Sequence, residues 1–198
     1  MQFKSSFARL AAFAFFLLSF TMLVCAAPAP VSEGLAVRDG SLVARTTDYT
    51  ETCKTDLLVL KAAVKAKADL LPACPSTPGC VPADVIASIV VLIKAFIDKV
   101  KVQANITVDV SACISIVIDI IVYILVVLRA CAYLTVELCA QIDVILKAFI
   151  ELFLDLCLTI VLKLAIKAQI KLAVSACLDV LIRLKFKLIA DILGLVLA

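Results

Sequence analysis

Residues 106–192 follow a strict alternation, which limits the ways in which this chain can bury its apolar side chains. Every even-numbered position in the stretch is apolar, and every charged, amide, hydroxyl or thiol side chain stands at an odd-numbered position. From Asp143 to Asp191 a polar side chain also recurs at every fourth residue. Alternation is typical of half-buried strands, whereas a four-residue spacing places side chains on neighbouring turns of a helix.

The absence of turn residues favours helices over strands. Residues 83–193 contain neither Gly nor Pro, so the turns that a long series of hairpins needs are not encoded there. We therefore predict an all-α, disulfide-linked bundle of four to six hydrophobic helices. A β or mixed structure for the alternating stretch 106–192 is the alternative, because 106–120 is rich in β-branched residues.

Two helical segments can be placed by their spacing. Residues 53–71 carry an apolar stripe at helical intervals, and Pro82 can open a second helix that continues to about residue 102. A single straight helix over 143–191 would be about 73 Å long and would smear its polar stripe around the axis. We therefore expect at least two helices there, with a break near 163–171.

The N-terminal part of the chain is typical of an exported protein. Lys4 and Arg9 precede an apolar run over 10–24, and small residues follow at Ala26 and Ala27, as in a secretory signal peptide. The sequence predicts a signal peptide over 1–26, a disordered leader or pro-segment over 27–49, and a single helical domain over 50–198. The alternative for the first segment is a membrane anchor that is retained.

Cysteine usage agrees with secretion. Of nine cysteines, Cys25 falls inside the predicted signal peptide, which leaves an even number for an oxidised framework. We expect four disulfides, with Cys74 and Cys80 linking the proline-rich loop 72–82 to the helices. No CxxC pair and no His accompany them, which argues against a metal site. The eight cysteines are Cys53, Cys74, Cys80, Cys113, Cys131, Cys139, Cys157 and Cys177.

Asn105 begins the sequence Asn-Ile-Thr, which is an acceptor for N-glycosylation. In a secreted protein this sequon predicts a glycosylated, exposed turn. The alternative is a sequon that is not used.

The sequence contains no catalytic motif. A nucleophile usually needs a neighbouring base, most often His, and the chain has none. We predict a protein that is not an enzyme and that uses no cofactor or metal. Asp119 lies in the most apolar segment, where we expect it to face solvent with the other odd-numbered polar residues. Charges nearly balance after Arg45, so a nucleic acid partner is not expected.

The excess of apolar residues indicates an interaction surface. We expect a secreted, non-enzymatic, cysteine-rich protein that contacts an apolar, lipid or cell surface, or that associates with itself. The alternative is an integral membrane protein with a span near 110–128. The basic residues predicted at a lipid surface are Lys163, Lys167, Lys171, Arg183, Lys185 and Lys187. The apolar residues predicted to enter the lipid beside them are Leu164, Ile166, Leu172, Leu184, Phe186 and Leu188.

Overall fold

The computed structural model describes residues 47–103 and 106–196, and over these residues the chain is almost entirely helical. This confirms the all-α prediction. Five of the described α-helices have sixteen or more residues, and two near the C-terminus have six and seven. The elements are β1 Thr47–Asp48, α2 Thr50–Ala68, the 3-10 helix η1 Cys74–Ser76, α3 Pro82–Val102, β2 Ile106–Thr107, α4 Val110–Ala130, α5 Val136–Asp155, α6 Ile160–Ser175, α7 Leu178–Arg183 and α8 Lys187–Leu193.

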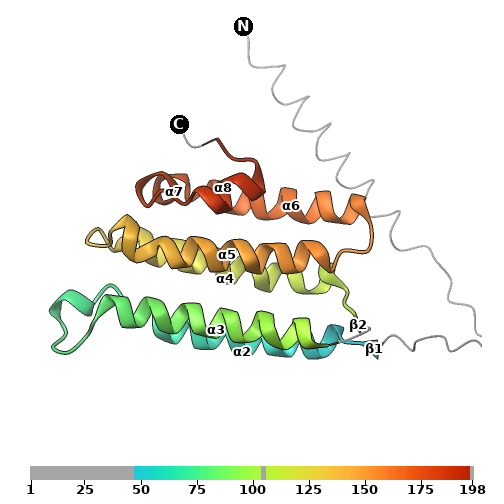
Figure 1. Cartoon of the computed structure of the whole chain (residues 1–198), viewed down its shortest axis with the longest axis horizontal. Helices are drawn as coiled ribbons and strands as arrows, with labels where there is room; N and C mark the ends of the chain where they lie inside the picture. The colour runs from blue at the N-terminus through green and yellow to red at the C-terminus, as the bar shows by residue number, and fades with distance from the viewer. Residues whose placement is uncertain (1–46, 104–105, 197–198) are drawn as a thin grey trace, which may run out of the picture. The chain divides into compact units, whose positions relative to one another are not determined.

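The helices stack in three layers (Figure 1). The first layer holds α2 and α3, the second holds α4 and α5, and the third holds α6, α7 and α8. Helix α2 packs on α4 and α3 packs on α5, while α4 and α5 also contact α6 on their other side. The middle layer is therefore covered on both faces, which places the most apolar helix, α4, inside the bundle.

The alternating stretch forms helices, so the β alternative is wrong for residues 106–192. Within that stretch only Ile106–Thr107 is a strand among the described residues. Side chains at odd-numbered positions cap the first turns of three helices. Asp109 accepts a hydrogen bond from the Ser111 amide at the start of α4. Thr135 accepts from the Leu138 amide at the start of α5, and Thr159 accepts from the Leu162 amide at the start of α6. These N-caps replace the Gly and Pro signals whose absence made the boundaries hard to place.

The prediction that 143–191 divides into at least two helices is confirmed, but the position near 163–171 is wrong, because α6 is continuous over Ile160–Ser175. The chain breaks instead at 156–159, where Thr159 caps α6, and again at 176–177. A four-residue spacing drifts by about 40° at each step, so Lys163, Lys167 and Lys171 spread over only about 80° of the helix surface. A helix of four turns accommodates that drift. The predicted start of the second helix at Pro82 is confirmed.

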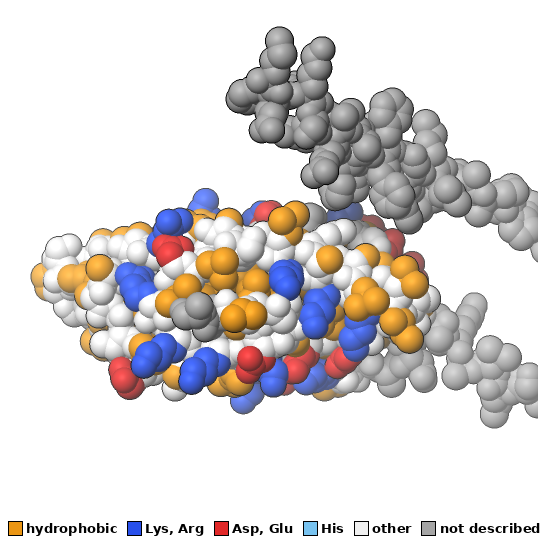
Figure 2. Space-filling model, turned by 90° about the horizontal axis from the view of Figure 1, so that it is seen from above, with side chains coloured by type: hydrophobic (Ala, Val, Ile, Leu, Met, Phe, Trp, Pro, Cys, Tyr) orange, Lys and Arg blue, Asp and Glu red, His pale blue; other side chains and the backbone are white. Residues whose placement is uncertain are grey.

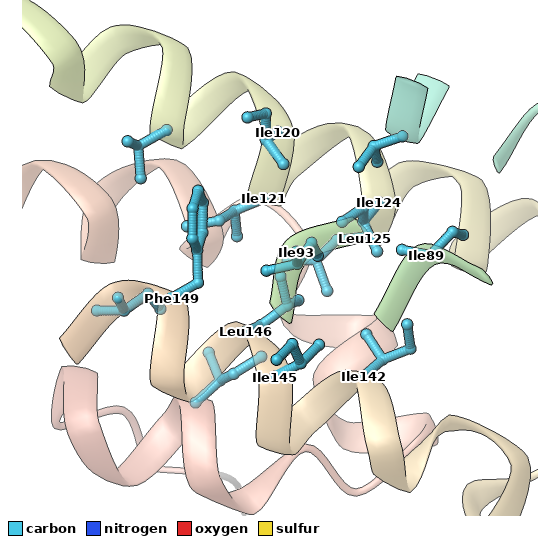
Figure 3. Packing of buried hydrophobic residues seen from close by; sticks show 14 of the residues in the cluster. Ile89, Ile93, Ile120, Ile121, Ile124, Leu125, Ile142, Ile145, Leu146 and Phe149 are labelled. Atoms are coloured by element: carbon cyan, nitrogen blue, oxygen red, sulfur yellow. The ribbon is translucent and has the colours of Figure 1, made fainter. Parts of the chain in front are cut away.

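The core lies where α3, α4 and α5 meet (Figure 3). Phe96, Phe149 and Phe153 form an aromatic group there, with ring centroids 5.4 to 6.2 Å apart. Close packing of large side chains on all three helices is the main stabilising contribution to such a bundle. Buried residues that converge in this region include Ile89, Ile93, Ile120, Ile121, Ile124, Leu125, Ile142, Ile145 and Leu146.

A short parallel strand pair aligns the starts of α2 and α4. Thr47 pairs with Ile106, and the Tyr49 amide donates to the Thr107 carbonyl at 2.9 Å. The Asp109 amide then donates to Thr50 Oγ1 at 2.9 Å. Residues 47–49 are thus part of the folded domain, which extends the predicted boundary at residue 50 toward the N-terminus. The predicted signal peptide and the remainder of the leader lie outside the described residues.

Asp143 is the one buried charged side chain among the described residues, with 6% of its surface exposed. Its carboxylate accepts hydrogen bonds from the amides of Leu188 and Ile189 at 2.9 and 3.0 Å. Those amides open α8, so a residue of α5 caps another helix and fixes the third layer on the second. Burial raises the pKa of Asp143, although the two amide hydrogen bonds act in the opposite direction.

Replacing Asp143 with Ala should destabilise the protein by about 1–3 kcal/mol, because two amides at the α8 start would lose their acceptor. Urea unfolding followed by circular dichroism measures this difference. Asp155→Ala is the matched control, since Asp155 is exposed and pairs only with Lys163 on the surface, where an ion pair contributes about 0–1 kcal/mol. Equal stability of the two variants would contradict the capping role.

The stability difference between the parent and Asp143→Asn should depend on pH. The folded-state pKa of Asp143 is raised above its ordinary value of 3.8. Protonated Asp143 therefore contributes to the free energy of unfolding fully below pH 3.8, and this contribution is lost as the pH rises through the folded-state pKa. The parent should lose stability relative to Asp143→Asn across that range. If the parent instead gained stability relative to Asp143→Asn as the pH rose, the folded protein would favour the carboxylate, which would contradict the prediction.

Candidate functional site

Helix α6 is attached to the bundle by a narrow stripe. Only Ile166, Ile170 and Val174 are buried on this helix. The spacing of four residues places these three side chains on one side, where α6 packs on α4, α5 and α8. The other side chains of α6 are exposed or only partly buried.

A second apolar stripe runs along the outer side of α6. Val161, Leu164, Ala168 and Leu172 recur at helical spacing and are exposed, with 62% of Leu164 and 77% of Leu172 accessible to solvent. At 100° per residue their mean direction lies roughly opposite the buried stripe. Seen from above this layer, hydrophobic side chains gather among lysine and arginine side chains (Figure 2).

The first residue of α6 and the segment that precedes the helix also expose apolar side chains. Leu158 and Ile160 are exposed by 81% and 78%, and no charged residue lies between Asp155 and Lys163 in the sequence. Soluble proteins seldom expose neighbouring large apolar side chains without a binding role. We refer to Leu158, Ile160, Val161, Leu164 and Leu172 as the α6 apolar face.

Lysines lie between the two apolar stripes of α6. Lys163 pairs with Asp155 at 3.2 Å, and Lys171 Nζ donates to the Gly194 carbonyl at 2.7 Å. Lys167 makes no ion pair or side-chain hydrogen bond with another described residue. All three ammonium groups border the α6 apolar face from the same side of the helix.

The remaining predicted basic residues have a different arrangement. Arg183 directs its guanidinium back to the bundle, where it donates to the Leu128 and Arg129 carbonyls at the end of α4. Its structural role is to satisfy the last carbonyls of that helix. Lys185 has a left-handed backbone with φ of 53°, and Lys187 begins α8; both side chains are exposed.

Three of the apolar residues predicted to enter lipid are buried instead. Ile166, Leu184 and Phe186 pack inside the protein, so they cannot contact a lipid surface while the fold is intact. Leu164 and Leu172 are exposed as the prediction requires, and Leu188 is half-buried. The prediction placed lipid contact along all of 163–188, whereas the most exposed large apolar side chains between residues 156 and 188 belong to α6 and the segment before it. The sequence signal for this was the uncharged run over 156–162.

The cysteines are only partly arranged as predicted. Cys74 and Cys80 form a disulfide with a Cα–Cα distance of 5.2 Å. This bond closes the proline-rich loop on itself and does not link the loop to the helices, because the six-residue separation already brings both ends together. The other six described cysteines are thiols in this structure.

Two of these thiols are buried side by side in the first turns of α2 and α4. Cys53 and Cys113 are both fully buried. The neighbouring Cys113 thiol and burial raise the pKa of Cys53, and the neighbouring Cys53 thiol lowers the pKa of Cys113. Cys157 and Cys177, by contrast, flank opposite ends of α6, whose sixteen residues span about 24 Å.

Helix α4 bears on the membrane-span alternative. Within the described residues Val110–Ala130 is the one helix whose length and hydropathy suit a membrane span, and just over half of its most apolar window is buried in the protein. Its exposed positions include Ser111, Ser115 and Asp119. Asp119 pairs with Lys61 at 2.7 Å on the surface, which confirms its predicted exposure. These features also suit the central helix of a bundle.

Two further predictions concern glycosylation and metal binding. Asn105 is outside the described residues. Among the residues that the structure does describe, no group of three His, Cys, Asp or Glu side chains is arranged to hold a metal ion.

Comparison with known proteins finds no matching family model, no matching curated protein and no matching solved structure.

Peptide mapping under non-reducing conditions should recover the Cys74–Cys80 linkage and no peptide joining Cys157 to Cys177. The length of α6 keeps the second pair beyond the roughly 7 Å that a disulfide allows between alpha carbons. The mapping should be repeated after unfolding in a thiol-blocking reagent, so that disulfide exchange does not alter the pairing. Recovery of a Cys157–Cys177 peptide from one chain would contradict the position of α6.

Proposed function

We propose that this protein is a secreted, non-enzymatic protein that binds an anionic lipid surface through the α6 apolar face. The observation that carries the proposal is the second apolar stripe of α6, with Leu164 and Leu172 exposed on the side opposite the bundle. A helix with apolar residues on two sides can pack on its own domain and still present a surface to a lipid layer.

The lysines of α6 suit such a surface because their charged ends can remain at headgroup level while their stems cover apolar area. Each lysine near an anionic surface contributes about 1 kcal/mol, whereas full burial of one Leu or Val side chain contributes roughly 1.5–3 kcal/mol. The five side chains of the α6 apolar face therefore outweigh the three lysines in this proposal. Binding should weaken in high salt and should not disappear.

The prediction that the protein is secreted rests on the N-terminal sequence and on the Cys74–Cys80 disulfide. A secreted protein with this surface would meet lipid at the outside of a cell. The N-terminal segment would be removed on export in this proposal, and the folded domain would bind by itself.

The integral-membrane alternative is supported by the length and hydropathy of α4. The packing of α2, α6 and α7 against that helix supports the surface-binding proposal, because those contacts would have to open for α4 to face lipid. Carbonate extraction of cell membranes separates the two: a surface-bound protein is released and a spanning protein stays in the pellet.

Binding to phosphatidylcholine vesicles that contain phosphatidylserine should weaken at least tenfold in the double variant Leu164→Gln, Leu172→Gln, since a loss of about 1.4 kcal/mol already gives tenfold. Vesicle co-sedimentation measures the change. The matched control is Leu58→Gln, Val59→Gln on α2, where both side chains are also exposed but belong to the first layer of helices and not to the α6 apolar face. The control should bind as the parent does.

Equal loss of binding in both double variants, or no binding by the parent, would refute the proposal. Sedimentation velocity on the same proteins tests self-association at this face. A dimeric parent that becomes monomeric only in the α6 variant, with vesicle binding unchanged, would assign the face to a second copy of the chain and would also refute the proposal.

A further inference from the structure

A separate apolar groove lies between α3 and α5. Its volume is about 510 Å³, which is within the range of small-molecule sites in proteins. Val90 and Ile97 on α3 face Ala140, Val144 and Ala148 on α5 across the groove. The two alanines are the reason that it is open, because a methyl group at these positions leaves the space between the helices unfilled. No residue of α6 lines it.

The rim of this groove carries lysines without partners in the described structure. Lys94 and Lys101 are two turns apart on α3, about 10.5 Å along the axis, and both line the groove and are exposed. Neither belongs to any of the ion pairs in the described residues, whereas their neighbour Lys99 on another side of α3 pairs with Asp56 at 2.7 Å. Asp98 also lines the groove, which leaves the rim with a net positive charge.

The two ends of the groove differ in chemistry. At one end Val90 and Ala140 are apolar. At the other end Lys101 and Ala148 also border a second hollow, of about 330 Å³, whose lining includes Glu151 and Asp155. Those carboxylates are paired with Lys147 and Lys163, whereas Lys101 belongs to no ion pair among the described residues. An anionic group is therefore favoured at Lys101, with an aliphatic chain extending toward Val90 over about 16 Å of α3.

We propose that the α3/α5 groove binds one long-chain fatty acid. The carboxylate pairs with Lys101, with Lys94 contributing additional positive charge. The hydrocarbon chain lies along Ile97, Val144 and Val90. A single chain suits the width of a groove formed by two adjacent helices, and the net positive rim is complementary to a carboxylate. This site is independent of the α6 apolar face, because it is built from different helices.

Fluorescence titration with cis-parinaric acid, a fluorescent polyene fatty acid, tests the site. One molecule should bind per protein, and Lys101→Glu should weaken binding about tenfold by replacing attraction with repulsion. Lys67→Glu, an exposed change on α2, is the matched charge control and should bind as the parent does. The methyl ester of the probe should bind the parent more weakly than the acid.

Ala148→Phe should prevent binding by filling the groove, with circular dichroism confirming that the variant is folded. The α6 variant Leu164→Gln, Leu172→Gln should retain full binding of the probe, so failure of this proposal is distinguishable from failure of lipid-surface binding. The proposal is overturned if the parent does not bind the acid, if Lys101→Glu and Lys67→Glu bind it equally, or if the α6 variant alone loses binding.

Discussion

Burial of α4 between two layers of helices is the constraint on which the rest of this structure depends. Its Ile, Val and Leu side chains occupy almost every direction around the helix, so partners are needed on more than one side. Helix α2 supplies one partner and α6 and α7 supply others. The polar residues Ser111, Ser115 and Asp119 mark the direction that remains in solvent. The layered arrangement follows from the need to cover this helix.

The high content of apolar residues also leaves apolar side chains exposed on the third layer, which is covered on one face only by the described helices. Helix α6 buries three side chains against the bundle and exposes a second apolar stripe on its other side. The middle layer buries more of its apolar side chains, because it has neighbours on both faces. An outer helix with apolar residues on two sides therefore needs an additional partner, and lysines along one border make an anionic lipid surface complementary to it.

The sequence was sufficient to predict the helical class and the start of α3, because the absence of Gly and Pro from 83–193 and the position of Pro82 act locally. It was not sufficient for the break near 163–171 or for the exposed stripe. Ile166 and Leu164 are both apolar and two residues apart, and only their contacts distinguish the buried from the exposed side chain. Asp143 was assigned to a solvated face by its spacing, yet it caps α8 from another helix. Long-range contacts of this kind leave no periodic signal in a sequence.

The most direct measurement of lipid contact by α6 uses a tryptophan as a local probe, since the chain contains none. Leu164→Trp places the indole on the α6 apolar face, and Val59→Trp places it on α2 at a site of similar exposure. On vesicles that contain phosphatidylserine and brominated lipid, the emission of Leu164→Trp should shift to shorter wavelength and be quenched, while that of Val59→Trp should not change. Equal quenching of the two variants, or quenching of neither, would contradict the account.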